Sequence, residues 1–134
     1  MVISIPNIQT SIAMKSKNAN AIQLKSYTFA KRIVKLHLHL SKNLKQFDLS
    51  SQILRSGTSI GANVEEAIGA VSRKDFVNKM SIAYKEARET HYWLRLLHDS
   101  GLLEKKLADS LLSDCDETLR ILYSIISTTK AKNY

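Results

Sequence analysis

The chain has 134 residues, which is enough for one domain with its own hydrophobic core. It carries 24% charged residues, a formal net charge of +8 and a single cysteine, Cys115. One cysteine excludes an internal disulfide and fits the reducing cytosol. No apolar run approaches the roughly 18 residues that suggest a membrane span. We therefore expect a cytoplasmic protein that does not contact membranes.

The positive charge is concentrated in the N-terminal third. Residues 1–47 hold eight Lys or Arg and no acidic residue, whereas the other twelve basic residues are matched by all twelve Asp and Glu. Such asymmetry indicates an acidic partner, most simply a nucleic-acid backbone. The alternative is a solvated face that keeps the protein soluble.

The first eighteen residues contain Pro6 and several Asn, Ser and Thr, which favour irregular structure. They lack the charged start and long apolar core of a signal peptide. The rest of the chain has no proline and only four glycines, which favours long helices. We expect a weakly ordered leader at 1–18, a helical domain at 19–130 and a frayed tail at 131–134.

The first predicted helix covers residues 21–44. Its apolar side chains recur every three or four positions, which is typical of the buried face of a bundle helix. These positions are Ile22, Phe29, Ile33, Leu36, Leu40 and Leu44. On the face that we expect to lie opposite, five residues form a basic ridge, which we interpret as the nucleic-acid contact. The ridge consists of Lys25, Arg32, Lys35, His39 and Lys42.

The flank of this helix carries a short apolar strip made of Tyr27, Val34 and Leu38. The strip is a candidate subunit contact, although similar strips occur on monomeric proteins. No paired aromatic residues flank the basic ridge, so we expect it to contact phosphates rather than bases.

The second predicted helix begins at Ser50 or Ser51, either of which can cap it, and runs to about residue 70. Its apolar seam continues at spacings of three and four through a glycine. The seam is Ile53, Gly57, Ile60, Val64, Ala67 and Val71. Each glycine costs a helix about 1 kcal/mol relative to alanine, so we interpret Gly57 and Gly61 as points where a neighbouring backbone comes close. The alternative, a loop between two short helices, conflicts with the unbroken spacing.

A polar line lies beside this seam. It consists of Ser56, Ser59, Asn63 and Glu66. Polar groups near a core must be hydrogen-bonded. No nucleophile–base pair is present, so we interpret the line as a structural network that fixes helix register rather than as a catalytic site.

The third predicted helix, 73–100, has a capping box at Ser72 and Asp75 and ends at Gly101. One of its faces is predicted to contact another subunit, because tryptophan is a favoured interface anchor. This face comprises Ile82, Glu86, Glu89, Trp93 and Leu96. The alternative is that Trp93 packs against the fourth helix, 104–128, of its own chain.

No enzymatic pattern accompanies these helices. A di-iron bundle needs a Glu-x-x-His pair on each of two helices, but the residues three before His91 and His98 are Arg88 and Arg95. One cysteine cannot supply a zinc-finger spacing, and the glycines lack a phosphate-loop ending. We expect no catalysis, cofactor or metal, and we interpret Cys115 as inert packing.

Two strings carry a family resemblance: LRSGTSIGANVEEAIG and SRKDFVNKMSIAYKEARETHYWLRLL. Over about residues 26–129 the chain resembles the intervening-sequence proteins, some of which are encoded in insertions within bacterial large-subunit ribosomal RNA genes. The resemblance implies an antiparallel four-helix bundle that assembles into a ring-shaped homopentamer. A related branch is the accessory protein of diversity-generating retroelements, which binds a reverse transcriptase and nucleic acid. Most members of the family have no assigned activity.

These observations predict an all-α, up-down-up-down, antiparallel four-helix bundle. We expect a non-enzymatic oligomer, pentameric by resemblance, that binds RNA or DNA through the basic ridge of its first helix. The alternative is a protein-interaction scaffold, or an accessory subunit of a neighbouring enzyme such as a reverse transcriptase, without direct nucleic-acid binding.

Overall fold

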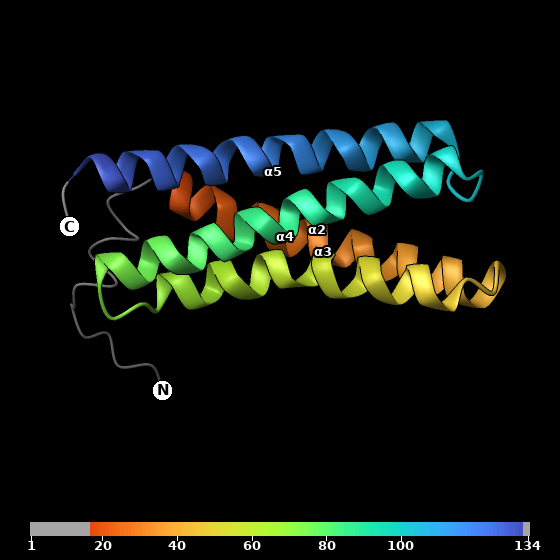
Figure 1. Cartoon of the computed structure of the whole chain (residues 1–134), viewed down its shortest axis with the longest axis horizontal. Coiled ribbons are helices and arrows are strands. Elements are labelled where there is room, and N and C mark those ends of the chain that lie inside the picture. The colour runs from red at the N-terminus through yellow and green to blue at the C-terminus, as the bar shows by residue number, and fades with distance from the viewer. Residues whose placement is uncertain (1–16, 133–134) are drawn as a thin grey trace.

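The structure, a computed structural model, describes residues 17–132 as four long helices joined by short turns (Figure 1). A short π-helix, η1, extends the first of them. The elements are α2 (Lys17–Leu38), η1 (His39–Asn43), α3 (Phe47–Ile68), α4 (Arg73–Asp99) and α5 (Lys105–Ala131). Almost all of the predicted leader lies outside the described residues, although its last two residues already belong to α2. The tail is described only as far as residue 132.

Consecutive helices run antiparallel and pack side by side, and α5 returns to lie against α2 (Figure 1). Within the described residues, α2 with α4 and α3 with α5 form the diagonals, since neither pair makes close backbone contacts. The predicted up-down-up-down bundle is therefore confirmed. The contact between α2 and α5 is the least extensive of the four neighbouring pairs. Among residues 17–132, no helix combines the length and hydropathy that crossing a bilayer requires.

The predicted core stripe of the first helix is buried except at its last position. Leu44 is 38% exposed, whereas Leu40 is fully buried. Leu44 lies past the end of η1, as its C-cap residue, so it no longer belongs to the helical stripe. Val71, predicted as the end of the next seam, lies beyond α3 and is 72% exposed.

The helix ends follow the predicted caps in two cases out of three. Ser72 Oγ accepts a hydrogen bond from the Asp75 amide at 3.0 Å, and Gly101 takes a positive φ of 78°. The predicted cap at Ser50 or Ser51 is wrong, because α3 already begins at Phe47. Ser50 is buried inside its first turn, where its hydroxyl donates to the Phe47 carbonyl oxygen at 3.0 Å.

The two helical glycines lie where α3 crosses α2. A Cβ added at Gly61 would lie 3.4 Å from the Ser26 carbonyl oxygen, which confirms the predicted approach of a neighbouring backbone. At Gly57 the close neighbour is instead a side chain, since an added Cβ would lie only 2.7 Å from Ile33 Cγ2. Both positions let α2 and α3 pack more closely than residues with side chains would allow.

Candidate nucleic-acid interface

The first half of the basic ridge faces α5 rather than open solvent. Arg32 Nη1 lies 2.6 Å from Asp114 Oδ2, and Arg32 Nη2 donates to Ser110 Oγ at 3.0 Å. Lys25 pairs with Glu117 and lies 3.9 Å from Asp114 Oδ1. These two basic side chains are only 21% and 31% exposed, so α5 neutralises their charge and covers much of their surface.

The prediction that the whole ridge lies opposite the core is therefore wrong. A helix turns by about 100° per residue, so Arg32 lies only about 60° around the helix from the buried Phe29. Its side chain consequently lies at the edge of the core stripe, where α5 packs. The acidic first half of α5 supplies the partner carboxylates.

The second half of the ridge is exposed and unpaired. Lys35, His39 and Lys42 are all exposed, and none of them forms an ion pair within residues 17–132. The Asn43 side-chain amide donates to His39 Nδ1 at 3.2 Å, which leaves Nε2 as the nitrogen available for an outside partner. We call Lys35, His39 and Lys42 the free basic surface.

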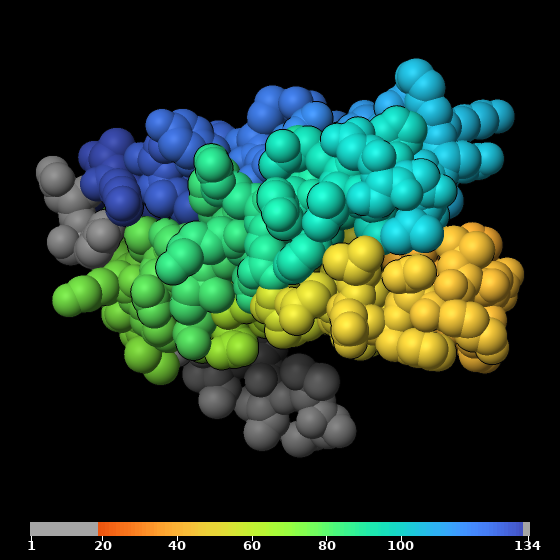
Figure 2. Space-filling view, turned by 45° about the vertical axis from the view of Figure 1, so that its right-hand side comes forward, coloured from red at the N-terminus to blue at the C-terminus, as the bar shows by residue number. Residues whose placement is uncertain are grey.

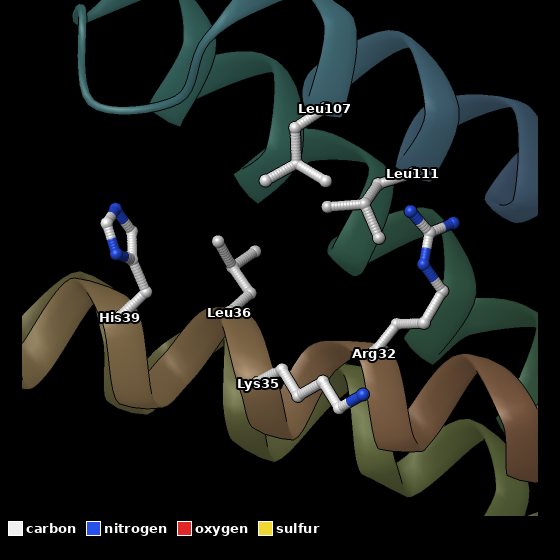
Figure 3. Close-up of a pocket in the computed structure, with 6 residues that line it drawn as sticks. All are labelled: Arg32, Lys35, Leu36, His39, Leu107 and Leu111. Atoms are coloured by element: carbon white, nitrogen blue, oxygen red, sulfur yellow. The ribbon is translucent and has the colours of Figure 1, made fainter.

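The free basic surface borders a hollow of about 240 Å³ between α2 and α5 (Figure 3). Its floor is aliphatic, because Leu36 points across the seam toward Leu107 and Leu111. Arg32 and His39 stand at its two ends, and none of the residues from 17 to 132 that line it is acidic. The hollow therefore combines an apolar floor with a basic rim.

A second hollow, of about 400 Å³, lies in the same seam nearer the start of α2, and its lining includes Asp114 and Glu117 beside Lys25. The ion pair of Arg32 with Asp114 thus lies between an acidic part of the seam and a basic part. Only the basic part, at the η1 end, offers an anion an uncompensated positive field.

The candidate subunit contacts differ in how open they are. Tyr27, Val34 and Leu38 are 62%, 40% and 42% exposed, and Leu24, at 71%, extends the strip that they form. We call these four residues the α2 apolar strip. The spacing of three between Leu24 and Tyr27 would have revealed the extra member. Lys31 lies over the Tyr27 ring, with its Nζ 5.3 Å from the ring centroid.

The predicted face on α4 is half-buried against α3. Arg55 of α3 pairs with Glu86, at 3.4 Å, and with Glu89. The Trp93 indole donates to Glu89 Oε2 at 2.9 Å, and its ring packs against the core. Ile82 and Leu96 are half-buried as well. Much of this face is therefore already occupied within the chain, and its role in subunit contact stays a prediction.

The polar line of α3 is hydrogen-bonded, but it is not one network. Ser56 is fully buried and accepts from Thr90 Oγ1 of α4 at 2.9 Å. Ser59 and Asn63 donate to carbonyl oxygens of their own helix. Glu66 pairs with Lys79 at 3.1 Å while remaining 59% exposed. Only Ser56 ties two helices together in the core.

The thiol of Cys115 is buried and hydrogen-bonded in the core of the bundle. Burial raises the pKa of the Cys115 thiol to about 12, with the nearby Asp116 and Asp114 adding to the shift. The thiol donates to the Ala87 carbonyl oxygen at 3.3 Å. Its prediction as inert packing is confirmed. No group of three potential metal ligands gathers among the residues that the structure describes.

The two α4 histidines hydrogen-bond at the bundle edge. His91 Nδ1 accepts from Arg95 Nε at 3.1 Å, so Nε2 carries the proton that faces Asp116 Oδ1 at 3.0 Å. His98 Nδ1 lies 2.9 Å from the Leu103 carbonyl oxygen.

A basic hollow on the α4–α5 seam was missed from the sequence. It measures about 250 Å³, and Arg88, His91 and Arg95 form its α4 side. In the sequence, Arg88 and Arg95 stand out only because they occupy the positions where a di-iron motif needs glutamate. Their spacing of seven, which places them on one helix face, was the available signal.

Comparison with known proteins supports the family resemblance. A family model described as the 23S rRNA-intervening sequence protein matches residues 18–124. The chain is also similar to a Bacteroides thetaiotaomicron protein of unknown function from the S23 ribosomal protein family, whose crystal structure matches with a TM-score of 0.81 and 48% identity. That match covers 82% of this chain and 98% of the other. Proteins of curated function gave no match. The chain therefore belongs to the 23S rRNA-intervening sequence protein family.

Proposed function

We propose that this protein is a non-enzymatic, cytoplasmic binder of RNA that holds a phosphate backbone against the free basic surface. The observation that carries the proposal is the contrast along one ridge. Lys25 and Arg32 are neutralised by α5, whereas Lys35 and Lys42 keep their charge facing solvent, with the exposed His39 ring between them. We take RNA as the first polymer to test, although the family description, 23S rRNA-intervening sequence protein, names the site of a gene and not a ligand. DNA is the chemically similar alternative.

The size of this surface suits a short stretch of backbone. Lys35 and Lys42 are seven residues apart, which is about 10 Å along a helix with a rise of about 1.5 Å per residue. Phosphates advance by about 3.4 Å per nucleotide along one strand of a duplex, so the surface spans roughly three of them. Contacts of this kind position a strand without reading its sequence.

The test is a charge reversal compared with a control variant that has the same net charge. Lys35→Glu with Lys42→Glu should lower affinity for an unstructured RNA at least tenfold and flatten the salt dependence, because each lost phosphate contact removes about 0.7 from the log–log slope. Lys74→Glu with Lys130→Glu makes the same change in net charge at the opposite end of the bundle and should act far more weakly. Equal losses in both double variants would contradict a local surface and leave only a diffuse field.

We further propose that the protein works as a homo-oligomer in which the α2 apolar strip contacts a neighbouring subunit. Four exposed apolar side chains on one helix face support this, and the family resemblance favours five-fold symmetry. Tyr27→Asp should shift the mass measured by light scattering toward the monomer while helical circular dichroism is retained. A native protein that is monomeric at tens of micromolar contradicts the proposal.

A second candidate function is that of an accessory subunit of another protein, such as a reverse transcriptase. The hollow with the leucine floor favours this second function. An apolar side chain of a partner protein would fit the floor, and an acidic side chain next to it would pair with the basic rim. The ratio of absorbance at 260 and 280 nm of the purified protein separates the two. Co-purified nucleic acid supports the first candidate, and a pure protein peak that captures an acidic partner supports the second.

A further inference from the structure

The seam between α4 and α5 carries a second basic surface, on the opposite flank of α5 from the free basic surface. Figure 2 shows α4 on one broad face of the molecule, between α3 and α5. Arg88 and Arg95 are exposed on its α5 side and form no ion pair within residues 17–132. The one acidic side chain lining the hollow between them, Asp116, already accepts from His91.

Exposed aromatic rings accompany these arginines. Tyr92 is 49% exposed and packs edge-on against Trp93, with ring centroids 5.1 Å apart. The Arg95 guanidinium carbon lies 5.9 Å from the Tyr92 centroid. Across the seam, Tyr123 of α5 is 63% exposed and rests against Tyr84 of α4, with centroids 6.3 Å apart. Each exposed ring is thus held by a second aromatic ring.

The rings and cations alternate along the bundle axis, with Tyr92 on the outward side of α4, about 100° around the helix from His91, and Tyr123 on α5. Tyr123 lies beside Tyr84, and Tyr84 precedes Tyr92 by eight residues on α4. Because a helix rises by about 1.5 Å per residue, the exposed rings of Tyr123 and Tyr92 are about 12 Å apart along the bundle axis. Arg88 lies between them on α4. Alternation of cations with stacking platforms is how proteins bind single-stranded nucleic acid without reading its sequence.

We infer that this seam binds unpaired nucleotides of a single strand, with bases stacked on Tyr92 and Tyr123 and phosphates held by Arg88 and Arg95. The inference rests on the proposed function and narrows its ligand to single-stranded nucleic acid. A base inside a duplex is already stacked and cannot lie on these rings. The free basic surface, by contrast, contacts only phosphates and accepts either form.

The test compares a fluorescein-labelled oligouridine of about 15 nucleotides with an RNA duplex of the same length. Tyr92→Leu with Tyr123→Leu should lower affinity for the single strand at least twentyfold, since stacking is worth about fivefold or more per base. The salt slope and the duplex affinity should not change. Tyr92→Phe with Tyr123→Phe keeps both rings and should retain wild-type affinity. Arg88→Gln with Arg95→Gln should instead flatten the slope.

The outcomes separate this inference from the proposed function. If the leucine variant binds the single strand as tightly as the wild type, while the Lys35/Lys42 reversal still lowers the affinity at least tenfold, the inference is overturned and the proposed function stands. If the leucine variant changes the oligomeric state and weakens both RNAs equally, the seam is a subunit contact and the inference is again overturned. If the wild type binds neither RNA, both are overturned.

Discussion

The two sides of α2 are built differently. On one side, α2 approaches α3 so closely that only glycine fits at residue 57. At Gly61, an added Cβ would lie 3.4 Å from the Ser26 carbonyl oxygen. On the other side, the contact of α2 with α5 is short and is bridged by the ion pairs of Lys25 and Arg32. A surface hollow lies on each side of these ion pairs. Close apolar packing specifies one structure, whereas a loosely closed polar seam can offer charge to a ligand. The bundle thus combines an extensive, close contact of α2 with α3, which still leaves a surface hollow of about 260 Å³ beside Gly61, with a short contact of α2 with α5 that is bridged by ion pairs.

The largest expected effect comes from overfilling the closed side. Gly57→Val places methyl groups where Ile33 already lies, and the branched Ile33 side chain has little freedom to move. We expect a loss of about 3 kcal/mol in the free energy of unfolding, measured by urea denaturation. Gly69→Ala is the control, because its added Cβ finds no atom closer than 3.8 Å. Equal stability of the two variants would show that the α2–α3 seam is not tightly closed.

A smaller effect is expected at the seam between α3 and α4. Ser56→Ala removes the buried hydroxyl bond between Ser56 and Thr90 and should cost about 1 kcal/mol, measured in the same assay, because the Thr90 hydroxyl still bonds to the Glu86 carbonyl oxygen. Asn63→Leu should cost less than about 0.5 kcal/mol, because the half-exposed Asn63 bonds only to its own helix. The reverse order of these two effects would restore the interpretation of the whole polar line as one network.

The smallest stability effect is expected on the open side. Asp114→Asn removes the carboxylate shared by Lys25 and Arg32, but such half-exposed ion pairs contribute only about 0–1 kcal/mol. The same change frees positive charge beside the free basic surface, so affinity for RNA should rise about threefold and its salt dependence should steepen. Ser113→Asn, one residue earlier on α5, leaves the charge unchanged and serves as control. Weaker RNA binding by Asp114→Asn would contradict the separation of the ridge into paired and free halves.

The fold could be predicted from the sequence because apolar periodicity fixes which face of each helix is buried. The stripe from Ile22 to Leu40, the cap at Ser72 and the turn at Gly101 all follow from local spacing. The candidate site could be predicted only in part. Whether Arg32 or Lys35 meets a carboxylate depends on how far α5 rotates and slides against α2, which spacing along one helix does not determine. The π-helix η1, after which Leu44 is exposed, has no local signature that we identified.

Lysine footprinting tests the central claim most directly. Acetylation of each lysine by a water-soluble ester, read by mass spectrometry with and without bound RNA, reports all of the relevant positions at once. Lys35 and Lys42 should be protected several-fold by RNA, Lys74 and Lys130 at the other end of the bundle should not, and Lys25 should react slowly in both states because Glu117 holds it. Equal protection of all lysines, or protection confined to Lys74 and Lys130, would contradict the assignment of RNA binding to the free half of the ridge.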